Sequence, residues 1–478
     1  MCLKSILLYL IFWVSCGLHA ADKKPNILLA IADDWGWPHA GVYGDSGVKT
    51  PIFDSVAKNG VLFTHAFVSS PSCTPSRGAI LSGQHHWRLK EGANLWGTIQ
   101  KDIQLYTDLL SKNGYLVGHC RKGWGPGSYK AGGRTIPPAG KTYENFKSFL
   151  SNRIKGQPFC FWFGSKDPHR PYELDSGVSK GIDIKKIKIY KSLPDHPTVR
   201  KDVADYFWEV QRFDSEVAKL ISMLKEAGEY ENTIIVITGD HGMPFPRCKG
   251  NLYDSGTRVP LAISWGKNIK GSRKISDFVS LIDLAPTFLD LAGVKVPDEM
   301  SGKSLVNILK SENEGELDKS RDFIIFGRER HTLAQKFPSK EGYPSRAIRT
   351  KDYLLIKNYK PDLWPAGVPT NSTRGIDFSD CDFSPTKQFI INNRDDSNIQ
   401  KFYSLAFAKR PKFELYDLKK DPDQTKNLAY EDDHENIRKK LYKRLKEALQ
   451  KSADPRLVSE ECKFKEFKYF GRKRKMPK

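Results

Sequence analysis

The chain has 478 residues and lacks any internal run of 18 or more apolar residues, any C-x-x-C pair and any internal repeat. A membrane-spanning helix needs about 20 predominantly apolar residues, so an integral membrane bundle is excluded. The absence of paired cysteines argues against a zinc or dithiol redox site of the usual spacing. The composition is neither collagen-like nor typical of a coiled coil, which excludes those fibrous classes.

The composition instead indicates a globular and strongly basic protein. Aromatic residues make up 12% of the chain, enough apolar surface to exclude a disordered polypeptide. Lys and Arg number 77 against 56 Asp and Glu, giving a formal charge of +21. Such a charge attracts polyanions, but no helix-turn-helix, zinc-finger or RNA-recognition pattern points to nucleic acid. We therefore expect an anionic polysaccharide as partner, with solubility or surface adhesion alone as the alternative.

The N-terminus has the features of a secretory signal peptide over residues 1–20. A short basic segment, Met1–Lys4, precedes the apolar segment Ile6–Val14, and small residues follow at Ala20 and Ala21. This pattern predicts a secreted or periplasmic protein, with a retained N-terminal anchor as the alternative. The residues before Cys16 form a poor lipobox, which disfavours lipoprotein anchoring.

The cysteines give no recognisable disulfide framework. Their spacing is irregular, and a chain of this length does not depend on disulfides for stability. Cys160 lies within an apolar run and is expected to be a buried thiol. Six cysteines follow the predicted cleavage point, namely Cys73, Cys120, Cys160, Cys248, Cys381 and Cys462.

The first two-thirds of the chain alternates between strand and helix patterns. Apolar, β-branched runs predict strands buried on both faces. A 3–4 spacing of apolar residues from Val203 to Leu224 predicts a helix that Gly228 ends, and Thr50-Pro51 predicts another helix start. This alternation favours a doubly wound α/β sheet. The predicted strands are Asn26–Ala32, Phe159–Phe163, Thr233–Thr238 and Val259–Trp265.

The composition changes after about residue 315, and we expect a smaller α+β subdomain there. Apolar residues from Ile437 to Leu449 form the stripe of a C-terminal helix, whereas residues 360–400 have little periodicity and are predicted to be a long loop. Short strands are predicted at Phe323–Phe326, Tyr353–Lys357 and Phe413–Leu418. The expected division is residues 22–320 as catalytic domain, 321–470 as C-terminal subdomain and 471–478 as basic tail.

Two pairs of adjacent residues that could bind a metal follow predicted strands. Asp33-Asp34 follows the first strand and Asp240-His241 follows the third. Ligands of α/β sheets gather at the carboxyl ends of the strands, and Ca²⁺ accepts six or more oxygen ligands. Both pairs are therefore candidates to converge on one cation. Capping of helices, or simple solvation, is the alternative for each pair.

The run from Ser72 to Gly78 contains Cys73-Thr74-Pro75-Ser76-Arg77, and this Cys-x-Pro-Ser-Arg pattern resembles the signature of the type I sulfatases. The resemblance extends over nearly all of the mature chain, in order and spacing. Its further motifs are Asp33-Asp34, Thr50-Pro51, Leu81-Ser82-Gly83, Gly239–Gly242, Phe413–Asp417, Asp421-Pro422 and Asn427-Leu428. Within that family the chain is most similar to heparan N-sulfatase (sulfamidase) and its bacterial relatives, through Asp167–Arg170, Pro244–Pro246, Asn251–Tyr253 and Ser384–Thr386.

The resemblance implies an alkaline phosphatase-like α/β fold, with a large mixed sheet flanked by helices and a smaller C-terminal α+β subdomain. It implies that a formylglycine-generating enzyme, or an anaerobic sulfatase-maturating enzyme, oxidises Cys73 to Cα-formylglycine (3-oxoalanine). It also implies one Ca²⁺ ion near residue 73. The implied ligands are Asp33, Asp34, Asp240 and His241, the last being less hard than the asparagine that is often found there.

The resemblance also implies roles for the cations around residue 73. Arg77 would orient the hydrated aldehyde, Lys122 would bind sulfate, and Lys249 would bridge sulfate and leaving oxygen. His169 would act as general acid, because an imidazole can donate a proton near neutral pH. The family usually carries histidine two residues after the sulfate-binding lysine, whereas this chain has Trp124. Residues that could bind the sugar, or else be ordinary surface or structural groups, are Arg170, Trp124, Arg134, His85, Arg88 and Arg247.

These features predict a secreted, calcium-dependent sulfatase that acts on a sulfated polysaccharide or oligosaccharide, such as a glycosaminoglycan or ulvan, with N-sulfate as one option. A hydrated aldehyde has two hydroxyls, so one can attack sulfur and the other can later expel sulfate. Two alternatives remain open at this point. One is a phosphate or phosphonate hydrolase of the same superfamily, and the other is a non-enzymatic binder of sulfated glycans.

Overall fold

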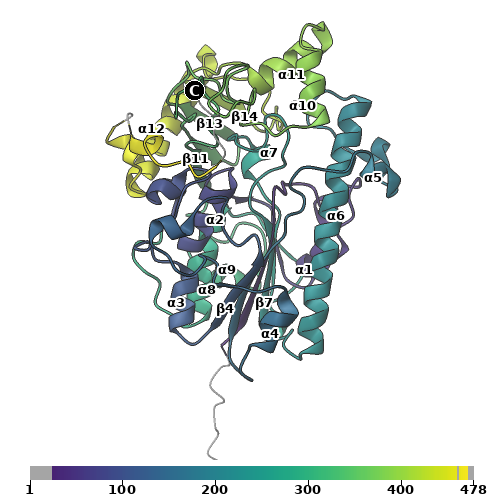
Figure 1. Cartoon of the computed structure of the whole chain (residues 1–478), viewed down its shortest axis with the longest axis vertical. Coiled ribbons are helices and arrows are strands. Elements are labelled where there is room, and N and C mark those ends of the chain that lie inside the picture. Colours follow the sequence, from purple (N-terminus) through teal and green to yellow (C-terminus); the bar gives the residue numbers. More distant parts are fainter. Residues whose placement is uncertain (1–23, 460–461, 472–478) are drawn as a thin grey trace, which may run out of the picture.

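The structure is a computed structural model, which describes residues 24–459 and 462–471. The predicted signal peptide and most of the predicted basic tail therefore lie outside the described residues. Between these limits the chain builds a large sheet with helices on both faces and a smaller sheet above it (Figure 1).

Eight strands form one mixed sheet in the order β5-β4-β6-β1-β7-β8-β2-β9. The central strand β1 is parallel to β6 and β7, and its last residue, Ala32, pairs with Gly239. Only β8 runs antiparallel to its neighbours, so the sheet is mixed, as the family resemblance predicted. The bounds are β1 Asn26–Ala32, β2 Val61–Phe63, β4 Leu116–Arg121, β5 Lys141–Thr142, β6 Phe159–Gly164, β7 Thr233–Gly239, β8 Leu261–Ser264 and β9 Arg273–Ile275.

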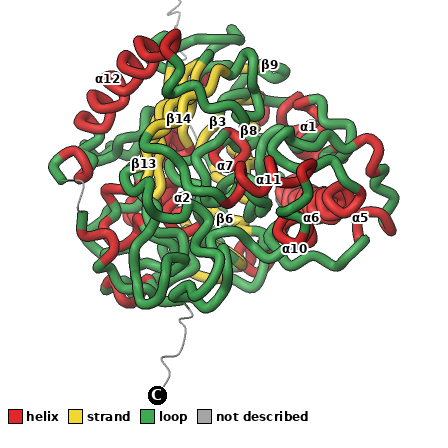
Figure 2. Tube along the Cα trace, turned by 90° about the horizontal axis from the view of Figure 1, so that it is seen from above, coloured by secondary structure: helices red, strands yellow, loops and turns green. Residues whose placement is uncertain are grey.

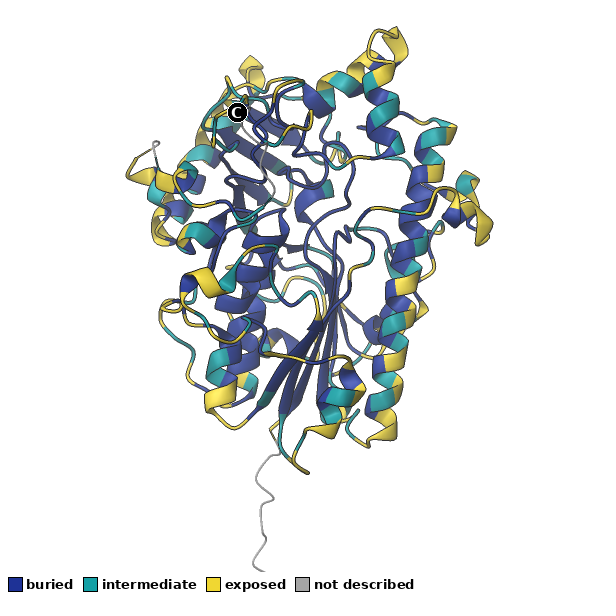
Figure 3. Ribbon diagram, in the orientation of Figure 1, coloured by how far each residue is buried: buried dark blue, intermediate teal, exposed yellow. Residues whose placement is uncertain are grey.

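Alternate residues of the central strands enter two separate cores. Leu28 and Ala30 of β1 pack with the helices on one face, whereas Ile27 and Leu29 pack with those on the other. This follows from the two-residue side-chain period of a strand. It explains why continuous apolar runs predicted these strands correctly: both faces are buried (Figure 3).

Helices α1, α4 and α6 cover one face of the sheet, and α2, α3 and α8 cover the other (Figures 1 and 2). No helix within the described residues has both the length and the apolar content to cross a bilayer. The bounds are α1 Pro51–Lys58, α2 Cys73–Ser82, α3 Tyr106–Lys112, α4 Phe146–Ser151, α5 Ser176–Ser179, α6 Pro197–Glu226, α7 Asp254–Thr257, α8 Leu284–Leu291 and α9 Val306–Lys310.

The predicted helix ends are confirmed, with one difference in capping chemistry. Gly228 lies just after α6 at a φ of +67°, where glycine has no Cβ penalty. Thr50 is the N-cap of α1, but its side chain does not cap the helix. Asp214 of α6 does so instead, because its carboxylate accepts hydrogen bonds from the amides of Ile52 and Phe53 at 3.0 and 2.8 Å. The start of α1 is thus fixed by the long helix beside it.

The C-terminal part contains an antiparallel sheet covered by a helix, as predicted. Leu441, Leu445 and Leu449 of α12 pack on this sheet, which α12 flanks in Figure 2. Strand β12 was not expected, because its six residues include two arginines and only one large apolar side chain, Ile348. The bounds are β11 Phe323–Arg328, β12 Ser345–Thr350, β13 Tyr353–Asn358, β14 Phe413–Asp417 and α12 Glu435–Lys451, and a separate strand pair joins β3 Ala66–Phe67 to β10 Val279–Ser280.

The prediction of a long loop at residues 360–400 is wrong for its second half. Helices α10 (Pro385–Asn392) and α11 (Ser397–Phe407) lie there. Ser384 caps α10 by accepting a hydrogen bond from the amide of Lys387, and proline occupies the first turn. The helix is only two turns long and buries few apolar side chains, so the sequence shows little periodicity. Its packing against α6 supplies the stability instead.

Leu445→Ala should lower the stability of the C-terminal subdomain. Leu445 is fully buried between α12 and the small sheet, and loss of a buried leucine side chain typically costs about 2–5 kcal/mol. We expect a lower midpoint of thermal unfolding than in the wild type. Glu447→Ala, at an exposed position of the same helix, is the control and should leave the midpoint unchanged. Equal midpoints for the two variants would contradict this packing.

Candidate active site

The two candidate ligand pairs, Asp33-Asp34 and Asp240-His241, meet where β1 and β7 end side by side. Asp33 and Asp34 follow β1, and Asp240 and His241 follow β7. The amide of Asp34 donates a hydrogen bond to Asp240 Oδ1 at 2.9 Å, and the amide of Asp240 donates to the carbonyl of Ala32 at 3.1 Å. Asp34 has a φ of +75°, which turns the chain sharply after the strand. The register of two neighbouring strands therefore brings the four side chains together.

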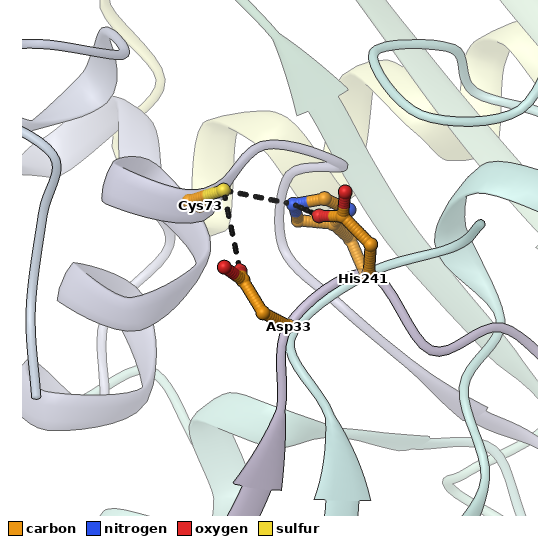
Figure 4. Close-up of side chains that lie close together, drawn as sticks. Asp33, Cys73 and His241 are labelled. Atoms are coloured by element: carbon orange, nitrogen blue, oxygen red, sulfur yellow. Dashed lines mark hydrogen bonds and ion pairs between the residues drawn. The ribbon is translucent and has the colours of Figure 1, made fainter. Parts of the chain in front are cut away.

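Cys73 is the first residue of α2 and is 2% exposed. Its Sγ lies 3.2 Å from His241 Nε2 and 3.7 Å from Asp33 Oδ1 (Figure 4). The positive end of the α2 dipole is therefore directed at the position where an anion would bind. Burial raises the pKa of the Cys73 thiol, so the unmodified cysteine is not a thiolate nucleophile at neutral pH.

The cluster has the ligand atoms of a cation site, and one of its buried carboxylate oxygens lacks a hydrogen-bond partner among the described residues. Ligand atoms of Asp33, Asp34, Cys73 and His241 all lie within 4.8 Å of one another. Asp34 Oδ1 is buried and has no hydrogen-bond partner in the described part of the chain, a state that costs free energy unless a cation or donor compensates it. His241 Nδ1 lies 3.1 Å from the Gly242 carbonyl, so Nε2 is the nitrogen that faces the cluster. These residues fit a divalent ion with oxygen and nitrogen ligands.

Asp240 lies beside this group rather than within it. Its Oδ2 accepts a hydrogen bond from Arg77 Nε at 2.8 Å, and its Oδ1 lies 3.7 Å from His241 Nε2. Asp240 thus has one oxygen committed to Arg77 and one directed at the cluster. Its role as a ligand stays a prediction.

Arg77 and Lys122 neutralise the buried carboxylates from one side. Arg77 is fully buried, and its Nη1 donates to the carbonyl of Lys122 at 2.6 Å. Lys122 Nζ lies 2.5 Å from both oxygens of Asp33. Burial alone would raise the pKa of Asp33, but the positive charges, Lys122 foremost, hold it well below its ordinary value. Asp33 is therefore ionised at neutral pH.

Lys249 occupies the opposite side and bridges two acids. Its Nζ lies 2.8 Å from Asp34 Oδ2 and 3.0 Å from Asp382 Oδ2. Burial would lower the pKa of Lys249, but Asp34 and Asp382 outweigh it and raise that pKa well above its ordinary value. The sequence reasoning missed Asp382. The only signal near it was the Ser384-Pro385 helix start two residues later, which fixes the end of its loop.

His169 is the most accessible of the predicted catalytic groups, with a side chain that is 36% exposed. Its Nδ1 lies 2.5 Å from the carbonyl of Arg170, which can only accept a hydrogen bond, so Nδ1 is the donor. Nε2 lies 4.0 Å from Asp34 Oδ2. The ring is thus held through Nδ1 and presents Nε2 to the cluster.

A cavity of about 640 Å³ opens above this cluster, within the size range of small-molecule sites. His331 and Arg374, which the sequence reasoning also missed, line it together with Asp382. His331 Nδ1 lies 2.7 Å from the hydroxyl of Ser72, the residue before Cys73. The predicted residues that line the cavity are Asp33, Cys73, Lys122, Trp124, His169, Arg170 and Lys249.

Arg170 borders the cavity, but its guanidinium is committed elsewhere. Nη1 and Nη2 donate to the two carboxylate oxygens of Asp202 at 2.8 and 2.9 Å, and Nε donates to the carbonyl of Pro244 at 2.9 Å. A bidentate buried pair of this kind is a structural element. These contacts hold Arg170 in place beside His169, and its role as a substrate-binding residue stays a prediction.

Arg134 and His85 are not brought to the cavity. Arg134 donates to Asp108 at 2.8 Å, and neither residue lines the cavity. His85 is buried with its ring stacked on Trp87, the centroids 4.4 Å apart. Both therefore lie away from this cavity, and their role in substrate binding stays a prediction. Trp124 does line the cavity, and its Nε1 has no hydrogen-bond partner within the described residues.

The assignment of Arg170 can be tested through its partner. Asp202→Asn leaves a buried, unpaired guanidinium, a change that typically costs about 3–5 kcal/mol. We expect Asp202→Asn and Arg170→Gln to lower the free energy of unfolding and the activity to similar extents. The double variant should be no worse than either single variant, because the two side chains act as one unit. A rise in KM that Arg170→Gln causes and Asp202→Asn does not would show that Arg170 binds substrate.

Comparison with known proteins places this site in a family. The sulfatase family profile matches residues 25–134 and 138–294, more than half of the chain. A second profile, "N-sulphoglucosamine sulphohydrolase, C-terminal", matches residues 239–365. An ulvan-active sulfatase of Formosa agariphila is 29% identical, over 89% of this chain and 80% of that protein. Human N-sulphoglucosamine sulphohydrolase is 28% identical, over 86% of this chain and 87% of that protein.

Solved structures share the fold at lower identity. One, described as a complex with its substrate D-glucosamine-2-N,6-O-disulfate, has a TM-score of 0.62 at 22% identity and covers 90% of this chain and 99% of its own. The phosphonate monoester hydrolase of Agrobacterium radiobacter has a TM-score of 0.64 at 16% identity, covering 91% and 97%. The fold alone is therefore compatible with a sulfatase and with a phosphonate hydrolase. The profile match, which includes Cys73, Arg77, Asp240 and His241, decides between them: this chain belongs to the sulfatase family, close to sulfamidase, and is a sulfuric ester hydrolase.

Proposed function

We propose that this sulfatase removes sulfate from a sulfated polysaccharide or oligosaccharide, using one Ca²⁺ ion and a formylglycine made from Cys73. One observation carries the proposal. Cys73 is buried at the start of α2 against Asp33 and His241, and it opens onto a cavity that Lys122 and Lys249 also line. A thiol with a raised pKa serves no purpose there as a nucleophile, whereas a hydrated aldehyde provides two hydroxyls at the same position.

The proposed substrate class draws its support from the relatives and from charge. The relatives' names specify ulvan and N-sulphoglucosamine as substrates of those proteins. The net charge of +21 on this chain favours approach of a polyanion. Whether the scissile group is an O-sulfate or an N-sulfate is left to the substrate screen described below. The signal-like segment at residues 1–20 supports export of the protein to the periplasm or medium, where such glycans occur.

Ca²⁺ and the formylglycine at position 73 would each supply one part of the chemistry. When bound, Ca²⁺ would be held by Asp33, Asp34 and His241, with Asp240 beside them, and would polarise a sulfate oxygen and lower the pKa of the attacking hydroxyl. A maturation enzyme would oxidise Cys73 to formylglycine. Hydration of that aldehyde would then provide the attacking hydroxyl.

The remaining steps belong to side chains of this chain. Lys122 and Lys249, held by Asp33 and Asp34, present their ammonium groups to the anionic oxygens of the sulfate. In the matured enzyme, one hydroxyl of residue 73 would attack sulfur as the bond from sulfur to the leaving atom of the sugar breaks, with His169 Nε2 donating a proton to that leaving atom. His169, having given up that proton, would then accept the proton of the second hydroxyl, and loss of that proton would expel sulfate and restore the aldehyde.

The function is tested by sulfate release from a panel of defined oligosaccharides of heparan, chondroitin, ulvan, carrageenan and fucoidan. We expect the matured wild type to release sulfate from at least one of them, and Cys73→Ala to release none while its thermal midpoint stays near that of the wild type. Intact mass should show formylglycine in the active protein. Activity of Cys73→Ala, or release of phosphate from aryl phosphates in preference to sulfate from any panel member, would refute the proposal.

The calcium assignment has a readout that does not need turnover. A ligand present at 100 times its Kd stabilises the folded state by about 2.7 kcal/mol, so Ca²⁺ should raise the thermal midpoint of the chelator-treated protein. Asp34→Asn should abolish this shift, because the unpartnered Asp34 oxygen loses its charge. Asp290→Asn, at an exposed position of α8, is the control and should keep the shift. An unchanged midpoint and full activity after chelation would contradict the site.

A further inference from the structure

A second and larger cavity, of about 950 Å³, lies where the α/β part meets the C-terminal subdomain. Segment 189–195, the end of α11 with the residues that follow it, and strand β14 provide its walls. It shares no lining residue with the catalytic cavity. We call it the basic cavity, because five cationic side chains line it, namely Lys191, Arg247, Lys401, Lys409 and Arg410.

The two carboxylates of the basic cavity are already occupied. Asp195 accepts hydrogen bonds from Arg200 at 2.5 and 2.8 Å. Glu414 accepts hydrogen bonds from the hydroxyls of Tyr253 and Tyr416 at 2.6 and 2.7 Å. By contrast, none of the five cations forms an ion pair within the described residues. The charge of Glu414, which its neutral tyrosine partners do not cancel, offsets part of the charge of Arg247 and Arg410, and the exposed lysines leave the cavity with a net positive charge.

Two buried arginine nitrogens in this cavity lack a partner. Arg247 is 4% exposed, and its terminal nitrogens donate to the carbonyls of Leu405 and Gln424. Its Nε and the Nη2 of Arg410 have no hydrogen-bond partner among the described residues. The Cζ atoms of Arg247 and Arg410 lie 3.7 and 5.0 Å from the centroid of the Tyr253 ring, so the two guanidinium groups are held at the cavity wall, where their charges attract an anionic ligand.

We infer that the basic cavity is a non-catalytic binding site for the sulfate and carboxylate groups of a sulfated glycan chain. The exposed Lys401 and Lys409 stand at its edge, while the buried Arg247 forms its floor. Apolar groups of Leu193 and Phe402 between these charges suit the faces of sugar rings. The choice of a sulfated glycan rests on the proposed function, which brings this polyanion to the enzyme. The site would hold the polymer while other parts of it are hydrolysed.

The test measures binding without turnover, in the Cys73→Ala background. The probe is a fluorescent heparan sulfate octasaccharide, and the variant is Lys401→Glu with Lys409→Glu. The control is Lys440→Glu with Lys443→Glu, which makes the same charge change at exposed positions of α12. We expect about tenfold weaker binding for the cavity variant, because like charges placed against an anion repel it. The control should bind nearly as tightly as the parent protein, and thermal midpoints should show that both variants fold.

Acetylation footprinting identifies the site directly. The octasaccharide should protect Lys191, Lys401 and Lys409 from acetylation, leaving Lys440 and Lys443 reactive, and a neutral dextran should protect none of them. Equal loss of binding in both double variants, no protection of Lys401 and Lys409, or equal protection by polyglutamate would overturn the inference. These outcomes are separable from the proposed function. Protection without sulfate release from any panel glycan would refute the function alone, and sulfate release without protection would refute this inference alone.

Discussion

The parallel pairing of β1 with β7 is the constraint on which the site depends. Its register aligns Ala32 with Gly239, so Asp33, Asp34 and Asp240 emerge within a few ångströms of one another. Three buried carboxylates this close cannot all stay ionised without compensating charge. The fold places Arg77, Lys122 and Lys249 against them. These cations thus compensate the buried carboxylates in the folded state, and an added divalent ion would share this role.

The same burial explains why an ordinary cysteine would be unsuited to position 73. Removing a thiolate from water in the company of Asp33 and Asp240 raises the pKa of the thiol, and the nearby lysines do not overcome this effect. The environment that disfavours an anionic sulfur is compatible with the neutral formylglycine hydrate of the proposed function. The electrostatics of the site therefore agree with the proposed modification of Cys73.

The C-terminal subdomain completes the site rather than merely covering it. His331 and Asp382 lie far along the chain from the signature at Cys73, yet both line the catalytic cavity. Asp382 forms an ion pair with Lys249, as Asp34 does, so the position of this proposed catalytic cation depends on a loop of the second part of the chain.

The sequence by itself indicated strands β1, β6, β7 and β8 of the central sheet and, through the signature motifs, the charged cluster except Asp382. Local patterns suffice there, because both faces of those strands are buried and because the signature residues stand on adjacent turns of one helix. Only the tertiary structure decided which partners the isolated charged residues contact. Arg170, Arg134 and His85 were equivalent candidates for substrate binding in the sequence, and Asp382 was not a candidate at all. Asp202 on α6 and Asp108 on α3 take up the two arginines, and Trp87 covers the histidine. Whether a charge meets a ligand or another side chain depends on partners distant in the chain, which a local pattern does not contain.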